Sequence, residues 1–205
     1  CNNDNIFFHQ YNSKVELNKK LNEYVNLINT IISNSNLENL EILFERLKNH
    51  FYSGGRIFLA GNGGSAAIAL HATTDLNKLV LENKKLNAFA LSSNIPQITA
   101  ISNDEGYENL FEKILQNFNV DENDTLITIS SSGNSKNLIN LINYATTANT
   151  KIFSLLGFDG GEIKNLSVTP IIANSNINYY GPVEDIHMII FHLFSHIIKK
   201  DLLEI

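Results

Sequence analysis

The 205-residue chain has one cysteine, three prolines and no tryptophan. A single cysteine forms neither an internal disulfide nor a thiolate metal cage, which suits a reducing compartment, so we expect a cytoplasmic protein. No apolar run approaches the ~18 residues of a membrane-spanning helix. The net charge of −6 lacks the basic excess that is typical of nucleic-acid binders. These absences exclude membrane and nucleic-acid partners from the prediction.

Glycine is also scarce, but several of the 11 residues gather in two short stretches. Hydrophobic residues make up 43% of the chain, which is enough for a buried core. No repeat, proline-rich linker or long charge run divides the sequence. We therefore predict one domain over residues 1–205, with an N-terminal helical segment (1–51) and an α/β core (52–205).

Hydrophobic periodicity predicts the elements of this domain. Apolar residues at helical spacing between residues 15 and 51 indicate two helices, and Ser35-Asn36 is expected to cap the second one. After residue 52, short apolar runs alternate with helical patterns, which favours a parallel sheet covered on both faces. The expected strands are 56–60, 86–91, 124–129, 151–156 and 168–173, and the expected helices follow the first glycine loop and span 106–118, 137–148 and 183–203.

Two small-residue loops each follow a predicted strand and precede a predicted helix. The first, Gly61-Asn-Gly-Gly-Ser65, has no lysine after its glycines and is not a P-loop. It matches a weak dinucleotide fingerprint, but the second strand ends in Ser92-Ser93-Asn94 without the carboxylate that would hold a ribose, so no nucleotide cofactor is expected. The second loop, Ser130-Ser-Ser-Gly-Asn-Ser135, offers four hydroxyls next to a helix start.

Either loop alone would be an ordinary turn with a helix cap. Right-handed crossovers, however, place both loops at the same edge of the sheet, where the N–H groups and dipoles of helix N-termini favour anions. The two loops together therefore predict a phosphate pocket.

The pair of loops resembles the sugar isomerase (SIS) domain, which binds phosphosugars. Three stretches, Gly61–Ala67, Thr99–Tyr107 and Ile129–Ser135, are similar to its phosphoheptose isomerase branch, and the similarity runs from about residue 15 to 200. This resemblance implies a three-layer sandwich of a five-stranded parallel sheet flanked by helices. It also implies a homotetramer that isomerises sedoheptulose 7-phosphate to an aldoheptose 7-phosphate through an enediol, for lipopolysaccharide or capsule synthesis.

Acid–base residues cluster on two predicted helices. His71 and Asp75 are four residues apart and share a helix face, while Glu184 and His192 are eight apart on the last helix. By the resemblance, Asp75 and His192 are the catalytic pair, and all four residues form a zinc site in some relatives. The resemblance further implies that the following residues contact the phosphate or the substrate: Asn62, Gly63, Gly64, Ser65, Asn103, Asp104, Ser130, Ser131, Ser132, Ser135 and Glu184.

Three positions depart from the family pattern. Asp75 stands in place of a glutamate and is one methylene shorter, Glu184 replaces a glutamine, and Gly181 replaces an aspartate. A set of two histidines and two carboxylates suits zinc or another divalent ion, and Glu184 would strengthen such a site. The departures leave open whether a metal is bound and which phosphosugar is the substrate.

Other polar residues of the last helix have simpler explanations. His187 and His196 are predicted to be surface or packing residues, and Asp185 is predicted to be a first-turn acid that complements the helix dipole. A rival hypothesis is a non-catalytic SIS module that binds a phosphosugar or a protein, as in relatives that regulate replication. The retained carboxylate at Asp75 and histidine at His192 favour the enzyme.

Overall fold

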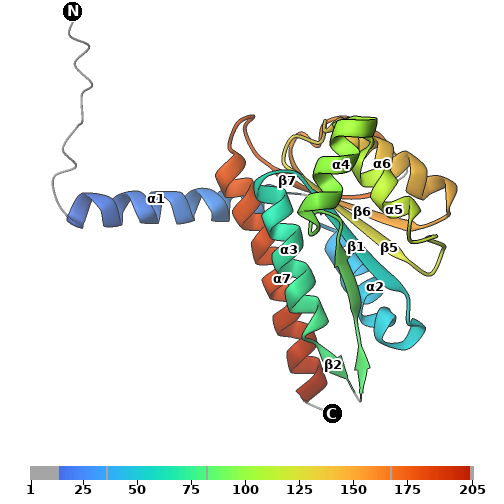
Figure 1. The fold of residues 1–205 in the computed structure, drawn as a ribbon. Coiled ribbons are helices and arrows are strands. Elements are labelled where there is room, and N and C mark those ends of the chain that lie inside the picture. The colour runs from blue at the N-terminus through green and yellow to red at the C-terminus, as the bar shows by residue number, and fades with distance from the viewer. Residues whose placement is uncertain (1–13, 36, 82, 167, 204–205) are drawn as a thin grey trace, which may run out of the picture.

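The computed structural model describes residues 14–35, 37–81, 83–166 and 168–203 and contains a five-stranded sheet (Figure 1). All its neighbouring strands are parallel, in the order β4-β1-β5-β6-β7, which confirms the predicted α/β class and strand number. The strands are β1 (Arg56–Gly61), β4 (Asn87–Ala90), β5 (Thr125–Ser130), β6 (Lys151–Phe158) and β7 (Thr169–Asn174).

Helices cover both faces of this sheet, as the sequence predicts. On one face lie α2 (Asn39–Ser53), α3 (Gly64–Asn77) and α7 (Tyr180–Leu203), with α1 (Lys14–Ser33) projecting from the body beside α7 (Figure 1). On the other face lie α5 (Leu110–Gln116) and α6 (Lys136–Thr147), next to α4 (Ile95–Glu105). The three layers bring α3 and α7 side by side along most of their length.

Successive side chains of each strand point to opposite faces of the sheet, so the core has two halves. In β1, Ile57 and Leu59 pack beneath α3 and α7, whereas Phe58 and Ala60 pack beneath α5 and α6. All four side chains are fully buried. Such a sheet, buried on both faces, explains why its strands appear in the sequence as continuous apolar runs.

Several small elements were not predicted. Helix α4 is capped by Asn94, whose side chain accepts a hydrogen bond from Gln97 N–H, and Pro96 lies in its first turn. Gly106, at φ +87°, ends α4, so the expected helix 106–118 starts with a 3-10 turn, η1 (Tyr107–Asn109), and continues as α5. The remaining additions are a hairpin of β2 (Val80–Leu81) and β3 (Lys84–Lys85) and the 3-10 turn η2 (Ile163–Asn165).

The predicted cap of the second helix is wrong. The residue before α2 is Glu38, and no side chain caps this helix in the described residues. Ser35 instead donates its hydroxyl proton to the carbonyl of Ile31 and accepts a hydrogen bond from Asn174 N–H in β7. It therefore ties the end of α1 to the sheet, and Asn36 lies outside the described residues.

The strand order creates a crevice at one edge of the sheet. The chain leaves β1 toward β4 on one side and leaves β5 toward β6 on the other, so the loops after β1 and β5 diverge. In open α/β sheets this switch point is where ligands bind. Over the described ranges, no helix combines the length and the apolar character that crossing a bilayer requires.

Candidate functional site

A small polar pocket of about 120 Å³ lies at the switch point. Both predicted loops contribute to it: Asn62 and Ser65 come from the end of β1 and the start of α3, and the serines follow β5. Helix α7 closes the pocket with two side chains that lie one turn apart. We call this cavity the serine pocket. Its lining residues are Asn62, Ser65, Ile129, Ser130, Ser131, Ser132, Ser135, Tyr180 and Glu184. The loops thus converge as the sequence predicts.

Hydrogen bonds hold the serine loop in a tight turn. Ser130 Oγ accepts from Gly133 N–H at 3.1 Å, and Ser132 Oγ accepts from Asn134 N–H at 3.3 Å. Gly133 has φ +63°, and a Cβ there would lie 2.1 Å from the carbonyl oxygen of Gly160, so no larger residue fits. Ser131 Oγ is buried without a hydrogen-bond partner in the described chain, which leaves it available to a ligand in the pocket.

Asn62 is held by two residues that sequence reasoning missed. Its side-chain amide exchanges two hydrogen bonds with that of Asn137 in α6, each 2.9 Å long. Tyr107 Oη also donates to Asn62 Oδ1, at 2.7 Å. Asn137 follows the serine loop by two residues and is almost fully buried, so an amide side chain in the first turn of the helix that follows the loop was the available signal.

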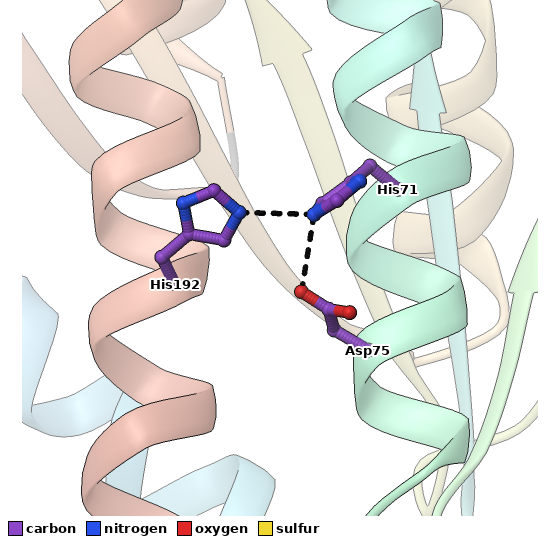
Figure 2. Close-up of side chains that lie close together, drawn as sticks. All are labelled: His71, Asp75 and His192. Carbon is purple, nitrogen blue, oxygen red and sulfur yellow. Dashed lines mark hydrogen bonds and ion pairs between the residues drawn. The ribbon is translucent and has the colours of Figure 1, made fainter.

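His71 and Asp75 of α3 and His192 of α7 point toward one another between the two helices (Figure 2). His71 Nε2 lies 2.9 Å from His192 Nε2 and 3.1 Å from Asp75 Oδ2. Both rings are exposed and the carboxylate is half-buried, so solutes reach the cluster. The predicted sharing of a face by His71 and Asp75 is confirmed, and packing adds His192 from 121 residues away.

This cluster has the donor chemistry of a divalent cation site. One donor atom from each residue lies within 4.8 Å of the others. A neutral His71 has at most one hydrogen on Nε2, and this hydrogen cannot be directed fully at both Asp75 and His192. A cation such as zinc would accept lone pairs from all three groups, because imidazole and carboxylate are common zinc ligands. The residues present therefore fit a metal ion.

Glu184 does not belong to this cluster. Its carboxylate lines the serine pocket and sits against the start of α3, where a Cβ on Gly64 would lie 2.3 Å from Oε2. Burial, together with the charge of Asp185, raises the pKa of Glu184. Because α7 rises ~1.5 Å per residue, Glu184 and His192 are ~12 Å apart along its axis. Three of the four predicted metal ligands come together, and the fourth, Glu184, lines the serine pocket.

The other predicted residues have different positions. Asn103 and Asp104 are exposed in α4, hydrogen-bond to each other at 2.8 Å and are not among the residues that line the pocket. His187 is fully buried and its Nε2 lies 3.2 Å from the Leu156 carbonyl, as expected for a packing residue. The prediction for Asp185 is wrong, because α7 begins at Tyr180 and has no acid in its first turn. Asp185 instead accepts a hydrogen bond from Tyr24 of α1.

Comparison with known proteins agrees with this geometry. The family model of the SIS domain matches residues 21–157, so the chain is an SIS-domain protein. A phosphoheptose isomerase from Helicobacter pylori is 37% identical over 164 residues, covering 80% of this chain and 82% of the relative. One from Clostridium acetobutylicum is 34% identical over 197 residues, covering 94% and 93%.

A solved phosphoheptose isomerase from Neisseria gonorrhoeae superposes with a TM-score of 0.78 at 26% identity, covering 90% of this chain and 97% of that one. The matches in sequence and fold thus cover between 82% and 97% of the length of these relatives. Within the SIS class, the chain belongs to the phosphoheptose isomerase family.

Proposed function

We propose that this protein isomerises sedoheptulose 7-phosphate to an aldoheptose 7-phosphate by proton transfer through an enediol. The observation that carries the proposal is the position of the His71–Asp75–His192 cluster relative to the serine pocket, both of them bordered by α3 and α7. A carboxylate and an imidazole beside a phosphate pocket are the groups that aldose–ketose isomerisation needs.

The spacing between the pocket and the cluster suits a seven-carbon substrate. Ser65 in the pocket and His71 in the cluster are six residues apart on α3, which corresponds to ~9 Å along the helix. An extended seven-carbon chain spans roughly 10 Å from C1 to its phosphorus, at about 1.3 Å per bond. A phosphate held by the serines therefore places C1 and C2 near the cluster.

In the proposed mechanism, Asp75 takes a proton from C1 of the ketose and returns it to C2 of the enediol. His192 carries the hydroxyl proton from O1 to O2, so that the carbonyl moves from C2 to C1 and no net proton is consumed. His71 orients the Asp75 carboxylate, and Asn103 and Asp104 are proposed to orient sugar hydroxyls. With zinc bound at His71, Asp75 and His192, the ion would polarise the substrate oxygens as a Lewis acid.

The finer features of the family belong to the same proposal. We infer a single functional domain that acts in the cytoplasm as a homotetramer and binds zinc at the His71–Asp75–His192 cluster. Leu17, Leu21 and Val25 leave apolar surface exposed on α1, which supports burial of this helix against other subunits.

The test is an NMR assay of the purified protein with sedoheptulose 7-phosphate in deuterated water, with and without added zinc. Because Asp75 is only half-buried, the proton that it takes from C1 exchanges with water before a proton is delivered to C2, so the mechanism predicts an aldoheptose phosphate with solvent deuterium at C2. Asp75→Asn and His192→Ala should abolish turnover but retain phosphosugar binding, whereas His196→Ala, one turn from His192 on α7, serves as the matched control. Binding without turnover in the unmodified protein would refute the isomerase and favour a phosphosugar-binding module.

A further inference from the structure

The serine pocket combines several hydroxyl groups with one carboxylate. Ser130 and Ser132 each use Oγ to accept a hydrogen bond from a backbone N–H, so their own hydroxyl hydrogens remain available to donate. Ser131 Oγ is buried and has no partner in the described chain. Among the described residues that line the pocket, none is a lysine, an arginine or a histidine. The pocket therefore offers hydrogen-bond donors to an anion but no positive side chain.

Glu184 is the group in this pocket that opposes an anion. Its carboxylate lines the pocket, and both carboxylate oxygens lie against Gly64 at the start of α3. The start of α3 is also where a phosphate would bind, because free N–H groups and the helix dipole favour negative charge there. A fully ionised phosphate and an ionised Glu184 would thus share a cavity of about 120 Å³ with no cation between them. Such a pair of like charges costs free energy.

A proton between the two groups removes this repulsion. Burial, together with the charge of Asp185, raises the pKa of Glu184, so its carboxylate accepts a proton more readily than an exposed one. The second pKa of a phosphate monoester is about 6, so this ligand also binds a proton close to neutral pH. A singly protonated phosphate monoester has two bare oxygens that accept hydrogen bonds and one hydroxyl that donates. This pattern matches the serine donors and the single carboxylate acceptor of the pocket.

The other titratable groups around Glu184 lie on α7 and α1. Asp185 follows it on α7, and Tyr180 of α7 lines the same pocket. His187, three residues further along α7, is neutral near pH 7 because burial lowers its pKa to about 4. Burial, the hydrogen bond to Asp185 and the charges of Asp185 and Glu184 raise the pKa of Tyr24 of α1 to about 12, so this phenol is neutral as well. The start of α3 and the serine loop contribute uncharged residues.

We propose that the serine pocket binds a phosphate monoester together with one proton, which lies between a phosphate oxygen and the Glu184 carboxylate. The proposal rests on the proposed function, because it assigns the protonation state in which the phosphate of the sugar is bound. Glu184 then determines specificity: the pocket accepts a phosphate monoester and rejects a sulfate monoester, which has no proton at neutral pH and offers only acceptors.

The test is calorimetric binding of glycerol 3-phosphate and glycerol 3-sulfate at pH 6 and pH 8, in two buffers with different heats of ionisation. At pH 8 the unmodified protein should take up about one proton for each glycerol 3-phosphate that binds. Its affinity should be about fiftyfold lower at pH 8 than at pH 6, because the protonated fraction of the ligand falls from about one half to about one hundredth. Glycerol 3-sulfate should bind more than about tenfold more weakly than glycerol 3-phosphate at pH 6.

The short probes keep the His71–Asp75–His192 cluster out of this measurement. Glycerol 3-phosphate spans roughly 5 Å from its phosphorus to its last carbon, about half the length of the seven-carbon chain. A probe held by the serines therefore ends before the cluster, and titration of the two histidines does not contribute to the expected proton uptake.

Glu184→Gln is the variant that tests the carboxylate, because its amide can donate a hydrogen bond to a fully ionised phosphate. It should bind glycerol 3-phosphate without proton uptake, with an affinity that changes by about twofold or less between the two pH values. It should also bind glycerol 3-sulfate more tightly than the unmodified protein does. Asp185→Asn is the matched control, since it removes the neighbouring charge, which does not line the pocket, and keeps an acceptor for Tyr24. This control should retain the proton uptake.

Binding of glycerol 3-phosphate to the unmodified protein at pH 8 without proton uptake would overturn the proposal, and so would equal affinity for the sulfate. Proton uptake that persists in Glu184→Gln would also overturn it, because another group would then hold the proton. None of these measurements involves turnover. A failed isomerase assay beside proton-linked binding would refute the isomerase alone, and binding without proton uptake would leave the isomerase proposal standing.

Discussion

Acid should destabilise this protein through a histidine that the proposed chemistry does not use. His187 is fully buried on α7, its Nε2 lies 3.2 Å from the Leu156 carbonyl, and its Nδ1 has no partner in the described chain. Burial lowers the pKa of His187 from 6.5 to about 4, despite the opposing effect of that backbone hydrogen bond. The ring is therefore neutral in the folded protein at pH values where the unfolded chain already binds a proton.

The sign and size of the effect follow from linkage. Below pH 6.5 the unfolded chain binds more protons at this position, so the free energy of unfolding decreases as the pH falls toward 4. At about 1.36 kcal/mol per pKa unit, His187 accounts for a loss of about 2 kcal/mol between neutral pH and pH 5. His50, whose pKa burial and the charge of Arg46 also lower to about 4, acts in the same direction.

Guanidinium unfolding at pH 7 and pH 5 tests this argument. His187→Leu loses the bond to Leu156 and should be less stable at pH 7, but the decrease between the two pH values should be smaller by about 2 kcal/mol. Phe191→Leu removes buried volume from the same helix without a titratable group, so it should lower stability equally at both pH values. An unchanged pH dependence in His187→Leu would refute the reasoning.

Three further predictions concern the site and its support. Gly64→Ala should reduce turnover and leave the protein folded by circular dichroism, because its Cβ would push the flexible Glu184 carboxylate out of its present position in the serine pocket; unchanged kinetics would show that this position of Glu184 does not matter. Arg56→Met should lower the free energy of unfolding by about 3 kcal/mol near neutral pH, because Arg56 forms an ion pair with the buried carboxylate of Asp124 at 2.5 Å. Denaturation at low pH, where the Asp124 carboxylate is protonated, should show a smaller difference between the variant and the unmodified protein. Zinc should raise the melting temperature of the unmodified protein but not of His71→Ala, and an equal rise would place zinc elsewhere.

The fold and the two small-residue loops were predictable because their signals are local. Alternating strands and helices appear in the sequence as changes of hydrophobic periodicity. The tight turns between them require glycine and serine, so these residues mark the loops. Helix α4 was not predicted, although Asn94 and Pro96 are helix-start signals. Its residues do not form a strong apolar stripe at helical spacing, and none of them is buried.

The sequence by itself determined the α/β class, the position of both loops at one edge of the sheet and the pairing of His71 with Asp75, because residues four apart on a helix must share a face. The relative height of two helices has no such local signal. Packing of α7 against α3 decided that His192 joins that pair while Glu184 reaches the serine pocket. Packing of α1 against α7 likewise decided that Tyr24 meets Asp185, 161 residues away, since such contacts depend on how whole layers dock.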